Sequence, residues 1–172
     1  MKKVVFAATG ASGAGFFLKL VKAAKDNCEA HVIVSKNAMK VLEAEENLRL
    51  NLNGLGVKIY DDLDLGAGPA SGSFGTDAMI IAPCSTNTLA KVANGISDTL
   101  ITRAASVTLK ERQRLVLGVR EMPFSAIALS QMQLLSSLGA IIAPPVLGYY
   151  ADIKSLDDME NFIIGKWLDA LK

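Results

Sequence analysis

The chain has 172 residues, a length that suits one domain, and 51% of them are hydrophobic while 20% are charged, which excludes a disordered chain. Its formal net charge of +1 excludes an overall field that would recruit nucleic acid or an anionic membrane. No apolar run reaches the roughly 18 residues of a membrane-spanning helix, and the run after Lys3 is too short for a signal peptide, so we expect a cytoplasmic protein.

Short apolar runs alternate with stretches that mix apolar and charged residues at helical spacing. The apolar runs predict strands over residues 4–9, 30–34, 57–60, 78–82, 115–119 and 140–143. The mixed stretches predict helices over residues 16–25, 37–46, 89–93, 98–107 and 124–138, and from 156 onward after a capping box. This alternation is typical of a parallel sheet covered on both faces. We therefore predict one α/β domain over residues 1–172, a three-layer Rossmann-like (flavodoxin-like) fold with a mainly parallel sheet.

Gly10-Ala-Ser-Gly-Ala-Gly15 follows the first predicted strand. Small residues at a strand-to-helix turn let a ligand approach N–H groups at the positive end of the helix. The spacing is not that of a dinucleotide fingerprint, and the second strand ends in Ser35-Lys36 without the acid that holds a ribose hydroxyl. The turn therefore fits a mononucleotide or another phosphate ester, or alternatively a tight turn in which Ser12 caps the helix.

Two segments between the second and third buried strands lack clear helix or strand signals. Residues 51–56 predict a turn-rich break. Residues 61–77 are rich in Gly, Ala, Ser and Asp and predict a long loop, a kind of segment that is often functional in compact domains. Its stretch 69–73 is either a lid or pocket wall, or a plain surface loop.

The segment Pro83–Thr88 forms a second strand-to-helix turn and offers the hydroxyls of Ser85, Thr86 and Thr88 beside free N–H groups. Such a turn suits a phosphate without a cationic side chain. Ordinary N-capping accounts for one of these hydroxyls better than for all three. Two phosphate-like turns flanking one crevice are stronger evidence for a phosphate site than either turn alone.

Arg120 and Glu121 follow the predicted strand 115–119, and Pro123 stops that strand. In an open α/β sheet, ligands bind beyond the carboxyl ends of the strands. This placement delivers a cation and a carboxylate to the rim of a pocket. Spacing alone predicts that the neighbouring cations, from Arg103 to Arg114, are mostly solvated.

The remaining residues with reactive or aromatic side chains give weaker signals. Cys28 and Cys84 lack metal-ligand spacing, so we predict free thiols and no metal site. His31 lies within a predicted strand and is expected to be packed, and Trp167 is expected in the core or at a subunit contact. Tyr150 follows the last strand and could bind phosphate, close a pocket or simply pack.

In this order and spacing the motifs resemble the flavin prenyltransferases of the UbiX type, a flavoprotein family formerly described as aromatic-acid decarboxylases. The resemblance spans Val4 to about Leu171. Its motifs are Thr9-Gly-Ala-Ser-Gly13, Ser35-Lys36, Pro69-Ala-Ser-Gly-Ser73, Pro83-Cys-Ser-Thr86, Arg103-Ala-Ala105, Leu109-Lys-Glu-Arg112 and Leu115-Val-Leu117 through Arg120-Glu-Met-Pro123.

The resemblance implies a metal-independent transferase that binds FMN. It implies transfer of the dimethylallyl group from dimethylallyl monophosphate to N5 and C6 of reduced FMN. The prenylated FMN would then serve a UbiD-type decarboxylase. The family also implies a homo-oligomer, commonly a dodecamer. From the net charge we expect no nucleic-acid or membrane partner.

Matching positions imply an FMN site made of Gly10, Ala11, Ser12, Ser35, Ser85, Thr86, Asn87, Thr88 and Arg120. They imply a site for the prenyl phosphate made of Arg103, Lys110, Arg120, Tyr150 and Lys166. Catalytic roles are implied for Ser12, near flavin N5, and for Glu45, Lys110 and Glu121, with Glu121 relaying a proton to the leaving phosphate. The family often has arginine where this chain has Lys166, and lysine keeps the charge but loses the bidentate fork.

Three other functions remain open from the sequence. A non-catalytic FMN carrier would bind flavin without turnover. A flavin-dependent decarboxylase of the same superfamily would also carry a motif like Pro83–Thr88, but such enzymes use a histidine near an early helix, whereas His31 lies in a predicted strand. A nucleotide-binding regulatory subunit would prefer AMP or ATP to FMN.

Overall fold

The computed structural model describes residues 1–46 and 54–172, and within these residues six strands form one sheet. In chain order the strands are β1 (Lys3–Ala8), β2 (Glu29–Val34), β3 (Lys58–Asp61), β4 (Ala78–Cys84), β5 (Arg114–Val119) and β6 (Ile141–Ile142). Their order across the sheet is β3-β2-β1-β4-β5-β6, and every neighbouring pair is parallel. The chain therefore winds outward in both directions from a switch point between β1 and β4.

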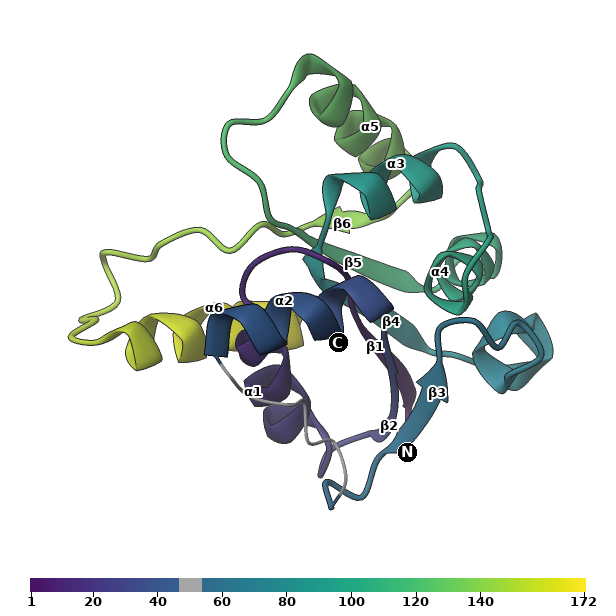
Figure 1. Cartoon of the computed structure of the whole chain (residues 1–172), viewed down its shortest axis with the longest axis horizontal. Helices are drawn as coiled ribbons and strands as arrows, with labels where there is room; N and C mark the ends of the chain where they lie inside the picture. The colour runs from purple at the N-terminus through teal and green to yellow at the C-terminus, as the bar shows by residue number, and fades with distance from the viewer. Residues whose placement is uncertain (47–53) are drawn as a thin grey trace.

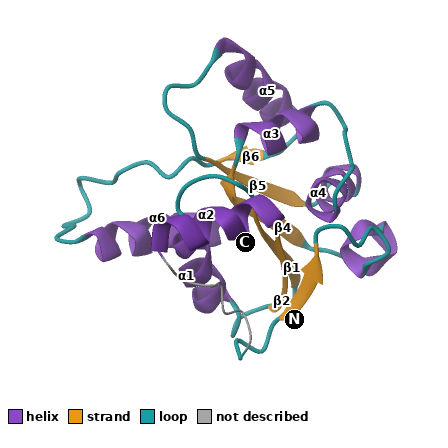
Figure 2. Cartoon of the chain, viewed as in Figure 1, coloured by secondary structure: helices purple, strands orange, loops and turns teal. Residues whose placement is uncertain are grey.

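Helices cover both faces of the sheet (Figures 1 and 2). They are α1 (Ala14–Ala24), α2 (Lys36–Glu46), α3 (Thr86–Ala93), α4 (Leu100–Lys110), α5 (Ala126–Ser137) and α6 (Leu156–Ala170), with short 3₁₀ turns η1 (Gly68–Ala70) and η2 (Gly72–Phe74). Helices α1, α2 and α6 pack on one face, and α3, α4 and α5 on the other. The predicted three-layer α/β architecture is confirmed. Among the described helices, none is both long and apolar enough to cross a bilayer.

The core forms two clusters, one on each face of the sheet, because side chains alternate along a strand. In β1, Val4 and Phe6 face α1 and α6, while Val5 and Ala7 face the helices of the other layer. Trp167 of α6 is 2% exposed, and its Nε1 donates a hydrogen bond of 2.8 Å to the backbone oxygen of Ala143. The expectation that Trp167 packs in the core is confirmed.

The predicted elements differ from the structure mainly at their ends. Strand β4 continues to Cys84, past the expected end at residue 82, with a shift of register after Ile81. Helix α3 begins at Thr86 rather than near residue 89, because Ser85 caps it. Residues 51–53 of the expected turn-rich break lie outside the described part of the chain. The expected loop 61–77 contains the two 3₁₀ turns, of which η1 packs against α4 and η2 against η1.

Gly118 of β5 provides a test of this packing. A Cβ at this position would lie 2.9 Å from Cβ of Ala82 and 3.0 Å from the ring of Trp167. We expect Gly118→Ala to lower the free energy of unfolding by about 1–3 kcal/mol, since the neighbours belong to a strand and a buried ring that cannot easily shift. Urea denaturation followed by circular dichroism measures the change.

Gly165→Ala is the matched control, because a Cβ there meets nothing within 4 Å and the residue lies inside α6. We expect this substitution to raise the free energy of unfolding by about 0.5–1 kcal/mol through helix propensity. Equal effects of the two substitutions would contradict the packing described for Gly118.

Candidate functional site

The switch point places the loops after β1 and β4 side by side at the carboxyl edge of the sheet. The loop after β1 begins at Thr9, and the loop after β4 begins at Ser85. These are the two hydroxyl-rich or glycine-rich turns that the sequence indicated. The fold therefore brings both predicted phosphate-like turns to one crevice.

Thr9 joins the two loops through its backbone and its hydroxyl. Its N–H donates to the backbone oxygen of Pro83 at 3.0 Å, and its Oγ1 lies 3.3 Å from the same oxygen. The same Oγ1 accepts a hydrogen bond of 2.9 Å from the N–H of Ser85 and lies 3.4 Å from the hydroxyl oxygen of Ser85. Thr9 is 4% exposed, so these bonds are shielded from water and fix the spacing of the loops.

Ser85 then organises the start of α3. Its Oγ accepts a hydrogen bond of 3.2 Å from the N–H of Thr88 and lies 3.1 Å from Oγ1 of Thr88. The N–H groups of Thr86 and Asn87 have no acceptor among the described residues. A helix start with free N–H groups, a positive dipole end and neighbouring hydroxyls is suited to an anion.

The second wall of this crevice comes from the loops after β1 and β2. Ser35 caps α2, since its Oγ accepts a hydrogen bond of 3.1 Å from the N–H of Ala38. Gly10 lies so close to α2 that a Cβ there would be 2.8 Å from Cβ of Asn37. A cavity of about 360 Å³ lies between these walls. It is lined by Thr9, Gly10, Ser35, Asn37, Ser85, Thr86, Asn87, Thr88, Lys91, Thr99, Ile101 and Thr102.

The alternative interpretation of Ser12 as a helix cap is wrong. The N-cap of α1 is Gly13, in the left-handed conformation with φ of 94°, and it makes no side-chain cap bond. The left-handed backbone conformation favours glycine, because residues that carry a Cβ are strained in it. Ser12 and Ala11 lie in the loop between β1 and α1, and they are not among the residues that line the 360 Å³ cavity.

Arg120 and Glu121 follow β5 at the same edge, as predicted. The N–H of Arg120 donates a hydrogen bond of 3.0 Å to the backbone oxygen of Cys84, so the exit of β5 is tied to the exit of β4. Both side chains are exposed, and Oε1 of Glu121 accepts a hydrogen bond of 3.0 Å from the N–H of Met122. They line a cavity of about 500 Å³ whose other walls are mostly apolar, formed by residues 122–124 and 144–147.

A smaller cavity of about 220 Å³ shares Pro144, Val146 and Leu147 with this one. Tyr150 and Lys166 line the smaller cavity. The two predicted prenyl-phosphate residues on the last loop and last helix therefore lie next to the Arg120 pocket. The apolar segment between them forms a common wall.

Two other predicted residues do not reach these cavities within one chain. Arg103 lies in α4, where its Nε donates a hydrogen bond of 3.0 Å to the backbone oxygen of Ala70. Lys110 ends α4 just before β5 begins, where it forms an ion pair with Glu111. Since Arg120 follows the other end of β5, six residues long, Lys110 and Arg120 are separated by about 20 Å of strand.

Glu45 lies in α2, and its side chain is outside the described part of the structure. The segment 69–73, considered as a possible lid, packs against α4 instead of lining the carboxyl-edge cavities. Roles for Arg103, Lys110 and Glu45 at this site stay predictions.

The ionisation of Cys84 and His31 bears on which reactions the protein can perform. Burial raises the pKa of the Cys84 thiol to about 12, so the thiol is neutral and unsuited to nucleophilic attack. His31 is fully buried in β2, where burial lowers the pKa of its imidazole and its Nδ1 lies 3.0 Å from the hydroxyl of Tyr60. Within the described residues no cluster of three or more potential metal ligands occurs. The free N–H groups at the start of α3 are thus suited to an anion, whereas the neutral Cys84 thiol is not suited to nucleophilic attack.

The sequence analysis did not assign several residues that line the 360 Å³ cavity to a site, namely Thr9, Asn37, Lys91, Thr99 and Thr102. Thr9 was visible as the last residue of a strand run, but only the pairing of β1 with β4 gives its hydroxyl a partner. Thr99 and Thr102 form a reciprocal capping box at the start of α4. This Thr-x-x-Thr pattern is weaker in sequence than the usual box with Glu or Gln. Nζ of Lys91 is paired with Asp98 at 2.6 Å, so its charge is already neutralised.

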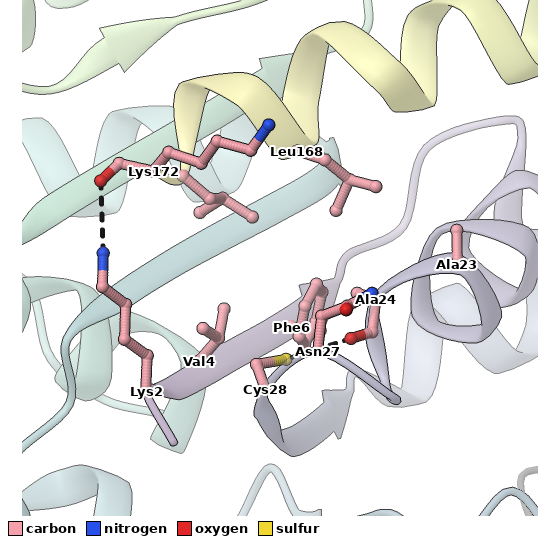
Figure 3. A pocket seen from close by; sticks show the side chains of 10 residues that line it. Lys2, Val4, Phe6, Ala23, Ala24, Asn27, Cys28, Leu168 and Lys172 are labelled. Carbon is pink, nitrogen blue, oxygen red and sulfur yellow. Dashed lines mark hydrogen bonds between the residues drawn. The ribbon is translucent and has the colours of Figure 1, made fainter.

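A further cavity, of about 440 Å³, lies at the opposite, amino edge of the sheet (Figure 3). Its apolar floor includes Val4 and Phe6, and two lysines stand at its rim. Nζ of Lys2 donates to the backbone oxygen of Lys172 at 3.2 Å, while Nζ of Lys172 pairs with Asp169 at 2.7 Å. None of the predicted site residues lines this cavity, so it is separate from the candidate site.

A model of the family described as Flavoprotein matches residues 1–168. The protein of Campylobacter jejuni named flavin prenyltransferase UbiX is 45% identical, over 99% of this chain and 93% of its own length. The protein of the same name from Thermoplasma acidophilum is 43% identical, over 98% of this chain and 94% of its own length.

Solved structures agree with this similarity. AnUbiX in complex with FMN and dimethylallyl pyrophosphate has a TM-score of 0.95 and 39% identity, covering 99% of this chain and 92% of that one. A dodecameric FMN-dependent UbiX-like decarboxylase from Escherichia coli O157:H7 has a TM-score of 0.93 and 38% identity, covering 97% of this chain and 93% of that one. A PPC decarboxylase, at 21% identity and a TM-score of 0.72, supports the fold alone.

Thr9→Val tests whether the hydroxyl bridge holds the crevice together. Valine keeps the shape but leaves the N–H of Ser85 without its acceptor, so we expect the free energy of unfolding to fall by about 1–3 kcal/mol. Amide hydrogen exchange at Ser85 should accelerate, and Thr9→Ser should restore both properties. Denaturation curves and exchange measured by NMR check these outcomes.

Thr108→Val is the control, because the Thr108 hydroxyl is also buried but acts as a donor, to the backbone oxygen of Ala104 at 2.8 Å and to Sδ of Met79 at 3.8 Å. Loss of this hydroxyl leaves no N–H group without an acceptor, so we expect the free energy of unfolding to fall by less than about 1 kcal/mol. If Thr9→Val left exchange at Ser85 unchanged, the bridge would not be what fixes the two loops.

Proposed function

The chain belongs to the flavoprotein family and, within it, to the flavin prenyltransferases, and we propose that it transfers the dimethylallyl group of dimethylallyl monophosphate to reduced FMN. Reduced FMN, when bound, supplies the nucleophilic N5 and C6 positions that accept this group. The product would be prenylated FMN, with a UbiD-type decarboxylase as its recipient. The observation that carries the proposal is the Thr9 bridge, which joins two donor-rich loops beside the apolar cavity that Arg120 and Glu121 line.

The donors on the β4 side fit the phosphate of FMN. A phosphate monoester needs several N–H or hydroxyl donors, and the start of α3 offers two free N–H groups beside hydroxyls that line the cavity. The close approach of Gly10 to α2 leaves no room for a side chain, so glycine lets the loop after β1 pack against α2 at the wall of the cavity. We assign FMN binding to Gly10, Ala11, Ser12, Ser35, Ser85, Thr86, Asn87, Thr88 and Arg120, with Ser12 also acting beside flavin N5.

The apolar cavity fits the isoprenoid substrate. Departure of phosphate from an allylic carbon is fast only when its growing negative charge is stabilised, and Arg120, Tyr150 and Lys166 supply a guanidinium, a hydroxyl and an ammonium for this. The apolar walls from Met122 to Phe124 and from Pro144 to Leu147 would exclude water from the developing allylic cation once a neighbouring copy covers them. Glu121, beside Arg120, would hand a proton to the leaving phosphate.

Assembly of several copies completes the proposal. Met122 is 90% exposed and Ile127 of α5 is 72% exposed, and Val146 and Tyr150 are also largely uncovered. Exposed apolar side chains in such number indicate a surface that another subunit covers. We propose a homo-oligomer, with a dodecamer as the expected form, in which a second copy brings Arg103, Lys110 and Glu45 to the substrate. The single domain over residues 1–172 would act in the cytoplasm.

Anaerobic incubation with reduced FMN and dimethylallyl monophosphate tests the function. We expect mass spectrometry to show FMN enlarged by one dimethylallyl group, with release of inorganic phosphate. Bound but unchanged FMN would instead identify a carrier. A parallel incubation with dimethylallyl pyrophosphate tells which phosphate ester the enzyme uses.

Glu121→Gln tests the proton transfer. The amide keeps the size and the hydrogen-bonding oxygen of the side chain but cannot supply the acidic proton, so we expect FMN affinity to be unchanged and prenylation to slow by about 10²-fold or more. Single-turnover measurements of prenylated FMN give the rate. Glu29→Gln, at the start of β2 and paired with Lys58, is the matched control and should turn over normally. Normal turnover of Glu121→Gln would remove Glu121 from the mechanism.

A further inference from the structure

Phe162 of α6 contacts Tyr150 and Lys166, two of the residues that line the smaller cavity. Its ring centroid lies 5.5 Å from that of Tyr150, at an interplanar angle of 86°, and 5.6 Å from Nζ of Lys166. Phe162 is partly buried and lines the cavity itself. One ring therefore touches a hydroxyl-bearing side chain from the loop and an ammonium-bearing side chain from the helix.

Lys166 follows Phe162 by one helical turn, so the two side chains lie on the same side of α6. Among the described residues, Lys166 has no carboxylate within 4.0 Å, whereas Lys19 of α1 pairs with Asp157 and Glu160 near the start of α6. Its ring contact directs the ammonium without neutralising its charge. That charge remains available to an anion in the cavity.

The ring also holds the loop that carries Tyr150. A Cβ on Gly148 would lie 2.4 Å from Cε1 of Phe162, so the backbone of the loop rests directly against the ring. The N–H of Gly148 points to Sδ of Met159 at 3.3 Å, which anchors the same loop to the start of α6. The edge-to-face contact with Tyr150, two residues later, then fixes the direction of the phenol.

We propose that Phe162 is a positioning residue for the phosphate of the isoprenoid substrate, acting through Lys166 and Tyr150. The proposal rests on the proposed function and deepens it. An arginine has a rigid planar fork that orients itself on a phosphate, whereas a lysine is a point charge on a flexible stem. With lysine at position 166, an external surface is needed to restrict the stem, and the Phe162 ring supplies it. Without the ring, both side chains must be ordered when the substrate binds.

Phe162→Leu tests the proposal because leucine keeps apolar bulk beside Gly148 but removes the ring. In steady-state assays with saturating reduced FMN, we expect KM for dimethylallyl monophosphate to rise about fivefold, with kcat changed less than about twofold. FMN affinity, measured by fluorescence quenching, should stay at the wild-type value. Phe162→Tyr keeps the ring and should restore KM.

A double-mutant cycle separates positioning from general destabilisation. In a Lys166→Ala background, Phe162→Leu should raise KM by clearly less than its effect alone, because part of that effect passes through Lys166. Phe74→Leu is the matched control, since the Phe74 ring also carries a lysine, with Nζ of Lys3 4.6 Å from its centroid, but it lies beside the amino end of β1. This control should lower stability to a similar degree and leave KM unchanged.

The failure of this inference is distinguishable from the failure of the proposed function. Calorimetric titration of the FMN-loaded protein with dimethylallyl monophosphate measures substrate affinity without requiring turnover. Weaker binding in Phe162→Leu with recovery in Phe162→Tyr supports the positioning role, whether or not the flavin is prenylated. Wild-type affinity in Phe162→Leu, full additivity in the cycle, or an equal loss in Phe74→Leu would overturn it.

Discussion

The adjacency of β1 and β4 is the constraint on which the site depends. After β1 and after β4 the chain continues toward opposite edges of the sheet. The hydrogen bonds between these two strands therefore do not fix the distance between their loops beyond the last paired residues. Thr9 supplies the missing restraint, since one buried hydroxyl accepts from the N–H of Ser85 while the backbone N–H of Thr9 reaches Pro83. Ser85 in turn caps α3, so the orientation of the helix start follows from the same bridge. The positions of the free N–H donors at the start of α3 therefore follow from the sheet and the Thr9 bridge.

Much of this arrangement could be predicted from the chain alone, for identifiable reasons. Buried parallel strands are nearly continuous apolar runs, so the strands and their hydroxyl-rich exits stand out without any alignment. The start of α3 was predicted three residues too late, because Thr86, Asn87 and Thr88 have low intrinsic helix propensity and compete for backbone hydrogen bonds. Their helical conformation depends on the cap from Ser85, whose position is set by a contact with Thr9, 76 residues earlier in the chain.

The sequence could not predict the proposed role of Phe162 or the separation of Lys110 from Arg120, and the reason is different. A phenylalanine at helical spacing on an amphipathic helix predicts only a buried side chain. Its contacts with Tyr150 and Lys166 require the path of the loop after β6, which has no periodic pattern. The distance between Lys110 and Arg120 follows from the length of β5, and spacing in sequence cannot say whether two cations at opposite ends of a strand meet in an assembly.

One chain builds the β4 side of the site more completely than the β5 side. On the β4 side, the bridge and the cap are buried or partly buried and made entirely within the chain. On the β5 side, Arg120 and Glu121 are exposed, and the apolar walls include Met122 and Val146, whose side chains are mostly uncovered. An allylic cation requires exclusion of water, which exposed walls cannot provide, whereas a phosphate held by backbone donors tolerates partial solvation. In the function we propose, one chain would hold the flavin phosphate, and a neighbouring copy would cover the walls and add a cation for the chemical step.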